Sequence, residues 1–276
     1  EATSGSTFRE VYKVLDELDY HPEIVKIEHY YSEEFYLKAF ADSVMNSKEY
    51  KESEYLLFSF HGLPVRQLKK ADPSNSHCQK VENCCEKVSE NNEFCYKAHC
   101  VKTIMKVADI IDPDIPFKVC YQSTFGPEQW IKPNIVNVLE DLAEEGIKKV
   151  SVACPSFTAD CLETLEEIAV ENHEDFEKLG GEYVKLIPSL NDNDDWVKSF
   201  ANYLHDKEFE SKLNERLFQI EKDKTMEMKI EKKEAERKLQ LVETEKNKII
   251  DELKFSIQQA NSVKQIAVSE AVKDIE

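Results

Sequence analysis

Three short apolar runs constrain the fold of this 276-residue chain more than any other feature. They lie at residues 55–60, 117–122 and 149–153, and a weaker run follows at residues 183–187. Continuous apolar runs of this length are typical of strands buried on both faces of a parallel sheet. Amphipathic stretches between the runs predict helices at residues 8–18, 33–47, 96–111 and 134–145. Strands that alternate with helices predict a doubly wound, Rossmann-like parallel α/β sheet.

Three further elements are expected. Ile24–Tyr30 alternates apolar and polar side chains, which predicts another strand. An acid-rich helix is expected after Ala153, and a closing helix is expected over residues 196–207. The α/β region therefore spans residues 1–207.

The last part of the chain, residues 208–276, has a different character. Neither Gly nor Pro occurs after Pro188, and Glu, Lys and Gln dominate from about Glu208 onward, so one long helix is predicted. Its apolar residues are loosely spaced, and Lys and Glu occupy heptad core positions between Glu221 and Lys238. Both a solvated helix and a weak coiled coil fit this pattern, and the second would allow self-association.

Composition narrows the function classes. A net charge of −19 argues against nucleic-acid binding and against electrostatic attachment to anionic membranes. No apolar run approaches the length of a transmembrane span, and no signal peptide is visible. Eight cysteines without a sign of export favour reduced thiols in the cytoplasm, where they are available for metal binding.

Two stretches carry the strongest candidates for acid-base chemistry. His61 directly follows the first apolar run, which is where functional residues of parallel sheets lie, although a lone histidine there is often structural. Asp160, Glu163, Glu167 and Glu171 follow the third run at steps of three and four residues, so their carboxylates can line one helix face. This spacing fits a cation- or proton-handling site, and it equally fits a solvated, acid-rich helix start.

A third stretch, from Tyr121 to Trp130, joins a strand end to a Gly-Pro turn with several aromatic residues. Exposed aromatic surface beside a strand end suits a flat, apolar ligand. The alternative is a turn packed on the core.

Five cysteines crowd into a polar segment at about residues 72–100. Their spacing is C-x5-C-C-x9-C-x4-C, which is neither a zinc ribbon nor a plant-type ferredoxin pattern. Four such thiols could still hold a metal ion or a cluster, and His77 and His99 keep a mixed zinc site open. The five residues are Cys78, Cys84, Cys85, Cys95 and Cys100.

Three segments together resemble the ferrochelatase family: LLFSFHGLP, VCYQSTFGPEQWIKP and CPSFTADCLETLEEI. The resemblance covers about residues 1–205 and implies a lyase that inserts ferrous iron into protoporphyrin IX to form protohaem. It implies His61 and Glu163 as catalytic residues, and His61, Glu163, Glu167 and Glu171 as residues that handle the metal. The residues that it implies for porphyrin binding are Tyr121, Gln122, Ser123, Trp130, Phe157 and Asp160.

The cysteine-rich segment resembles an insert of a bacterial subgroup of ferrochelatases that holds a two-iron two-sulfur cluster. The resemblance implies four ligands among the five cysteines, with Cys78, Cys95 and Cys100 favoured beside one of Cys84 and Cys85. Two features depart from the family: its N-terminal domain is expected to be largely missing, and the tail has no counterpart. Two other readings stay open, namely a chelatase for another tetrapyrrole such as coproporphyrin and a non-catalytic, cluster-binding remnant of the fold.

Overall fold

A computed structural model describes residues 4–273, and the surroundings of their side chains up to residue 264. Residues 1–3 of the predicted α/β region and residues 274–276 of the predicted tail lie outside the described residues. The chain forms two compact units, Glu1–Glu208 and Phe209–Glu276.

The first unit is built on a parallel sheet of four strands: β1 (Tyr55–His61), β2 (Phe117–Gln122), β3 (Lys149–Ala153) and β4 (Tyr183–Leu186). The order is β2-β1-β3-β4, and all neighbouring strands run in parallel. The chain leaves β1 for β2 on one side and later returns to pair β3 on the other. Because strand order reverses at β1, its carboxyl end is the point where α/β sheets usually bind ligands.

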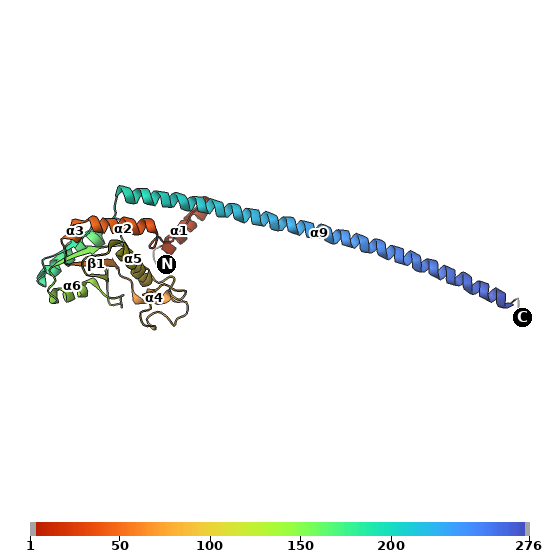
Figure 1. Ribbon diagram of the computed structural model, residues 1–276, viewed down its shortest axis with the longest axis horizontal. Coiled ribbons are helices and arrows are strands. Elements are labelled where there is room, and N and C mark those ends of the chain that lie inside the picture. Colours follow the sequence, from red (N-terminus) through yellow and green to blue (C-terminus); the bar gives the residue numbers. More distant parts are fainter. Residues whose placement is uncertain (1–3, 274–276) are drawn as a thin grey trace. The chain divides into compact units, whose positions relative to one another are not determined.

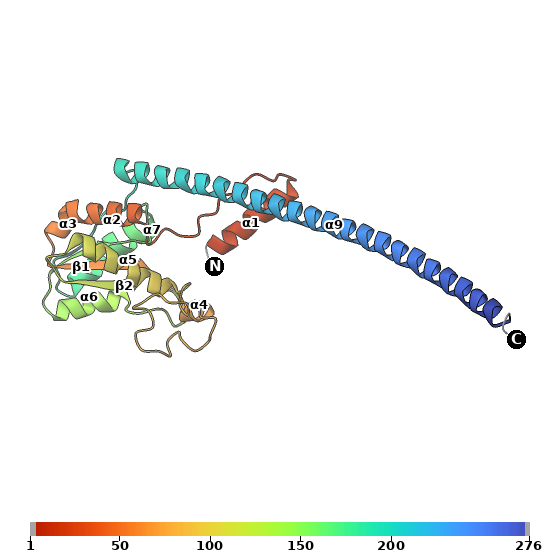
Figure 2. The same ribbon diagram turned by 45° about the vertical axis from the view of Figure 1, so that its right-hand side comes forward.

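Helices cover both faces of this sheet, as the sequence predicts (Figure 1). On one face, α2 (Glu34–Asn46), α4 (Val65–Lys70) and α5 (Tyr96–Ile111) pack against Leu56, Phe58 and Phe60 of β1. On the other face, α6 (Ile135–Glu144) and α8 (His173–Lys178) pack against Leu57. Figure 2 shows α2 and α6 on opposite sides of the strands. Successive side chains of β1 enter different cores because strand side chains alternate.

The expected strand at Ile24–Tyr30 is wrong. This segment joins α1 (Ser4–Glu17) to α2 as an extended stretch without sheet pairing. Its last residue packs on helices instead, since the Tyr30 ring lies 5.9 Å from Phe35 and 6.3 Å from Trp196, measured between ring centroids.

The acid-rich helix is broken into three parts. A short turn, α7 (Leu162–Leu165), leads into the π-helix η1 (Glu167–Asn172), and α8 follows. The Glu171 N–H donates to the Glu166 carbonyl five residues earlier. Insertions of this kind are frequent at functional sites, and here the wider turn changes the direction of the carboxylates along the helix.

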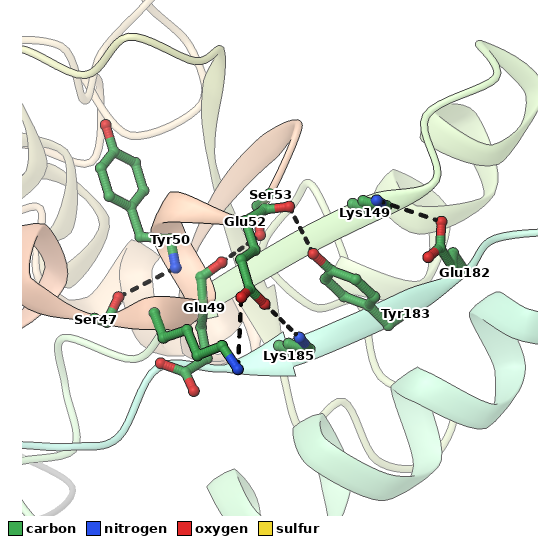
Figure 3. Close-up of polar contacts among 10 residues, drawn as sticks. Ser47, Glu49, Tyr50, Glu52, Ser53, Lys149, Glu182, Tyr183 and Lys185 are labelled. Atoms are coloured by element: carbon green, nitrogen blue, oxygen red, sulfur yellow. Dashed lines mark hydrogen bonds and ion pairs between the residues drawn. The ribbon is translucent and has the colours of Figure 1, made fainter.

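The amino end of the sheet carries a network of paired charges (Figure 3). Glu52, which follows α3 (Lys48–Lys51), accepts from Lys185 of β4 at 3.0 Å, and its carbonyl accepts from the Tyr183 hydroxyl at 2.6 Å. Lys149 of β3 lies 3.7 Å from Glu182. These contacts join α3 to the start of β3 and β4.

One helix, α9 (Asp194–Lys273), closes the first unit and contains the described residues of the second, 209–273. Its first turn packs Trp196 against the Phe35 ring, with 5.8 Å between centroids. Every side chain from residue 212 to residue 264 is exposed. The long helix is therefore confirmed, whereas the coiled coil stays a prediction.

Candidate functional site

The carboxyl ends of β1, β2 and β3 meet at one edge of the sheet and bring three predicted stretches together. β1 ends at His61, β2 ends at Gln122, and the chain after β3 forms the loop that leads to Glu163. His61 and Gln122 are register partners across β1 and β2. The site is thus a consequence of the parallel sheet.

The backbone at His61 is fixed on both sides. The Tyr96 hydroxyl donates to the His61 carbonyl at 2.9 Å, and the His61 N–H donates to the Ser156 hydroxyl at 3.3 Å. Gly62 is required because a Cβ there would lie 2.7 Å from the Gln122 carbonyl oxygen. A larger residue would push the ends of β1 and β2 apart.

The imidazole of His61 has a defined tautomer. Its Nδ1 lies 2.7 Å from the Gly62 carbonyl oxygen, which can only accept a hydrogen bond. Nδ1 therefore carries the proton of the neutral ring, and Nε2 keeps a lone pair that can accept another proton. The Phe157 ring lies 6.4 Å away, measured between centroids.

Gln122 joins β1, β2 and the acidic segment. Its side chain is fully buried and accepts from the Ser59 hydroxyl at 2.8 Å. Its amide nitrogen donates to the Glu163 carbonyl at 2.6 Å and lies 3.4 Å from a carboxylate oxygen of Glu167. A buried amide satisfied at both ends fixes where the acidic segment begins.

Glu167 is held by neutral donors. The Ser123 N–H donates to one carboxylate oxygen at 2.6 Å, and the Ser123 hydroxyl donates to the other. Ser123 adopts φ +58°, a backbone conformation that is uncommon for residues other than glycine. This conformation aims both of its donors at Glu167.

Glu163 is half-exposed beside His61. A hydrogen bond from the Cys161 thiol, a hydrogen bond from the N–H of Glu163 itself and the charge of His61 together lower the pKa of its carboxyl. The group is therefore an anion under ordinary conditions. Glu171, two turns farther on, is exposed.

Asp160 turns away from these carboxylates toward the loop after β4. Its side chain accepts from the Ser189 N–H at 3.2 Å and from the Asn191 amide at 2.8 Å. Burial alone would raise the pKa of Asp160, but these hydrogen bonds and one from Thr164 outweigh burial and lower it. Asp160 thus anchors a loop in this structure.

The aromatic candidates lie at different depths. Tyr121 is 1% exposed and lies beside Tyr96 and Cys100, and burial raises the pKa of its hydroxyl. Trp130 and Phe157 are half-buried, whereas Phe125 is 86% exposed. A ligand at this edge would reach Trp130, Phe157 and Ser123 directly, while Tyr121 and Gln122 lie beneath that surface.

The four expected metal-handling residues do not form a compact metal centre. Among the residues that the structure describes, no three His, Cys, Asp or Glu side chains come together in a way that would hold a metal ion. Two pairs among them are linked. The charge of His61 lowers the pKa of Glu163, and the Gln122 amide nitrogen contacts both the Glu163 carbonyl and the Glu167 carboxylate.

The cysteine-rich insert is ordered around two buried polar side chains. The Asp72 carboxylate accepts from the N–H groups of His77 and Cys78 at 2.9 and 2.8 Å, and the Asn92 amide donates to the Cys84 carbonyl at 2.7 Å. These bonds gather Cys78, Cys84 and Cys95 around a cavity of about 10 Å³.

The remaining thiols of the insert are close by. Cys85 lies 3.6 Å from Cys84, measured between sulfurs, and its thiol donates to the Cys95 sulfur, which lowers the pKa of Cys95. Cys100 is buried within α5 beside Tyr96, and burial raises the pKa of its thiol. All eight cysteines are free.

Several of these positioning residues were missed from the sequence. Ser59, Tyr96, Asp72 and Asn92 act through the backbone or through another side chain. Only the Asp-Pro-Ser-Asn run at Asp72 carries a local turn signal that could have pointed to such a role.

Comparison with known proteins gives one consistent result. Residues 1–208 match the family model of ferrochelatase. The chain is 37% identical over 203 residues to a ferrochelatase of Pseudomonas fluorescens strain Pf0-1, which covers 73% of this chain and 59% of that protein. It is 38% identical over 180 residues to a ferrochelatase of Coxiella burnetii strain Dugway 5J108-111, with 65% and 51% covered.

A third relative has similar coverage. A ferrochelatase of Pseudomonas entomophila strain L48 is 41% identical over 176 residues, which is 62% of this chain and 51% of that protein. The chain thus spans between half and three fifths of the length of these curated relatives. None of the described helices has a segment apolar and long enough for a membrane span.

Proposed function

The chain belongs to the ferrochelatase family, and from this membership we propose that it takes part in inserting ferrous iron into protoporphyrin to form protohaem. The observation that carries the proposal is the position of His61 and Glu163 at the carboxyl edge of the sheet, near enough for the imidazole to influence the carboxyl pKa. The reaction consumes one Fe²⁺ and one porphyrin and releases the two protons of its pyrrole N–H groups.

His61 is the proposed proton acceptor. Its Nδ1 is committed to the Gly62 carbonyl, so a pyrrole proton would move to Nε2. Glu163 would stabilise the imidazolium that forms, and its carboxylate would accept the second pyrrole proton. Because its pKa is lowered, the carboxylate is ready for this role.

Glu163, Glu167 and Glu171 are the proposed route for Fe²⁺. Glu171 is exposed, Glu167 is held by neutral donors, and Glu163 lies beside His61. Carboxylates that approach in pairs attract a divalent cation without enclosing it, which suits a metal that must be handed on. Phe157, Trp130 and Ser123 would contact the macrocycle at the same edge.

An anaerobic assay tests this proposal. Haem formation by the whole chain from Fe²⁺ and protoporphyrin, lost in Glu163→Gln and kept in Glu182→Gln at the other end of the sheet, is the expected result. Porphyrin binding without haem formation in the unaltered chain would favour the non-catalytic reading. Faster metallation of coproporphyrin would favour the other tetrapyrrole.

We also propose that the cysteine-rich insert carries a two-iron two-sulfur cluster, held by Cys78, Cys95, Cys100 and one of Cys84 and Cys85. The gathering of Cys78, Cys84 and Cys95 around one cavity and the lowered pKa of Cys95 support it, because thiolates are the ligands of such clusters, whereas Cys100 does not line that cavity. The cavity between them has room for roughly one water, so the insert would have to widen around a cluster.

Anaerobic reconstitution with iron and sulfide tests the cluster. Visible absorbance that disappears in Cys95→Ser and persists in Cys161→Ser, a cysteine outside the insert, is expected. Equal absorbance in both variants, or none in the unaltered chain, would contradict the cluster. We further propose the cytoplasm as the setting, with which eight free thiols are consistent. Self-association through α9 is proposed as well.

A further inference from the structure

The C-terminal part of α9 carries an unpartnered apolar seam. From Ala235 onward, apolar residues recur at alternating steps of four and three, and seven of the nine positions up to Val263 are apolar. The seam consists of Ala235, Leu239, Val242, Lys246, Ile249, Leu253, Ser256, Ala260 and Val263. Its larger apolar members, Leu239, Val242, Ile249, Leu253 and Val263, are 50–67% exposed in the single chain.

We propose that this seam binds the same seam of a second copy of this chain as a parallel, in-register two-stranded coiled coil. A 3.5-residue apolar repeat over about four heptads is the pattern that winds two helices around each other. A solvated single helix gains nothing from such a repeat, because its period of 3.6 residues would move the apolar side chains around its surface.

The core positions favour a pair over larger bundles. Lys246 occupies an a position between Val242 and Ile249, both d positions. A single charged residue in the core fixes register and oligomeric state at a cost in stability, because in a pair its ammonium can still reach water. In a trimer or tetramer the same group would be enclosed.

Charges beside the seam favour the parallel orientation. In a parallel pair, Lys238 faces Glu243 of the partner subunit, and Glu245 and Glu252 face isoleucines. In an antiparallel pair centred on the same seam, Glu245 would face Glu252 of the partner subunit twice. The parallel pair has two attractive contacts and avoids this repulsion.

The seam has a natural start. One heptad earlier, Lys232 would enter the core, and Glu231 would face Glu236 of the partner subunit. Like charges and a core lysine together disfavour continued pairing there. The helix before Ala235 is thus expected to stay single, because Lys232, Thr225 and Glu221 would occupy core positions there.

Sedimentation equilibrium of the full chain tests the pairing. We expect the unaltered 32.0 kDa chain to reach twice its mass. Leu253→Lys, in the seam, should weaken the dimer on the order of 100-fold. Phe255→Lys and Leu241→Lys change equally exposed residues outside the seam and should leave it intact. Circular dichroism checks that each variant keeps its helix.

Two further variants test the role of the core lysine and the parallel orientation. Lys246→Leu should tighten the dimer by roughly 10-fold, since it removes the core charge. Glu243→Lys should weaken it ~3-fold, and adding Lys238→Glu should restore it, because only parallel pairs bring these positions together.

A chain that stays monomeric, an equal loss in Leu241→Lys and Leu253→Lys, or a dimer that survives Leu253→Lys would each overturn the seam. A double variant without restoration would overturn the parallel orientation. None of these outcomes depends on iron or porphyrin, so the pairing of the seams is tested independently of the proposed chemistry.

Discussion

Glu52 and Glu182 at the amino end of the sheet pair with lysine, whereas Glu163 and Glu167 at its carboxyl end are held by neutral donors. At the amino end, Glu52 contacts Lys185 and Lys48, and Glu182 contacts Lys149. At the carboxyl end, Glu167 is held by Ser123 and Gln122, and Glu163 by Cys161. Within residues 4–264, neither Glu163 nor Glu167 forms an ion pair with Lys or Arg.

This difference separates a structural use of charge from a chemical one. A carboxylate paired with lysine is neutralised and ties elements together, whereas one held by neutral donors keeps its full charge toward solvent or a ligand. At the edge where strand order reverses, the fold thus supplies Glu163 and Glu167 as anions held by neutral donors.

The largest expected effect is the loss of haem formation in Glu163→Gln. The amide keeps the size of the side chain but removes its charge and its ability to exchange protons, so the rate should fall on the order of 10²- to 10⁴-fold. Stopped assays of haem absorbance measure it. Glu182→Gln is the matched control, and an equal loss in both would erase the contrast between the two ends.

Next in size is the destabilisation expected for Gln122→Leu. Leucine fills the space but leaves the buried Ser59 hydroxyl without its acceptor and the Glu163 carbonyl without its donor. Two unsatisfied polar groups should cost about 2–4 kcal/mol in the free energy of unfolding. Urea unfolding measures it, and unchanged stability would show that the bridge is dispensable.

A smaller effect is expected in the pH dependence of Cys161→Ala. In the native site the Cys161 thiol is the main cause of the lowered pKa of Glu163, so its removal should raise that pKa. Glu163 would then take up its proton at a higher pH, and activity should begin to fall at a higher pH as the solution is acidified. Cys161→Ser keeps a hydroxyl donor and should hold the native profile. Identical pH profiles for the alanine and serine variants would show that protonation of Glu163 does not cause the fall of activity at low pH.

The smallest effect is expected at the amino end, for Lys185→Met. Both partners of this ion pair are well exposed, so solvent screens their attraction. The unfolding midpoint should change by no more than ~2 °C, and haem formation should not change. A large loss of activity in this variant would mean that the charges at the two ends act together.

Much of the fold follows from the sequence because buried strands and helices carry strong local patterns. The strands β2 and β3 and the helix α5 have the predicted bounds. The strand expected at Ile24–Tyr30 was wrong because a period of two does not by itself tell sheet pairing from an extended segment, here one that places Tyr30 against Trp196.

The site follows less completely. The ends of the strands place His61 and Glu163 together, but the depth of their neighbours depends on which way each side chain points. Tyr121 and Gln122 are adjacent on β2, so they enter opposite faces, and both are buried. No local pattern tells a buried residue beneath a site from one that lines it.

One comparison tests the role proposed for Glu163 and Glu167 most directly. Two double variants of the full chain, Glu163→Gln with Glu167→Gln and Glu52→Gln with Glu182→Gln, would be assayed anaerobically with Fe²⁺ and protoporphyrin beside the unaltered chain. We expect the first pair to abolish haem formation and the second to retain the rate of the unaltered chain. Haem formed at the same rate by the first pair, or lost equally in both, would contradict the role proposed for Glu163 and Glu167.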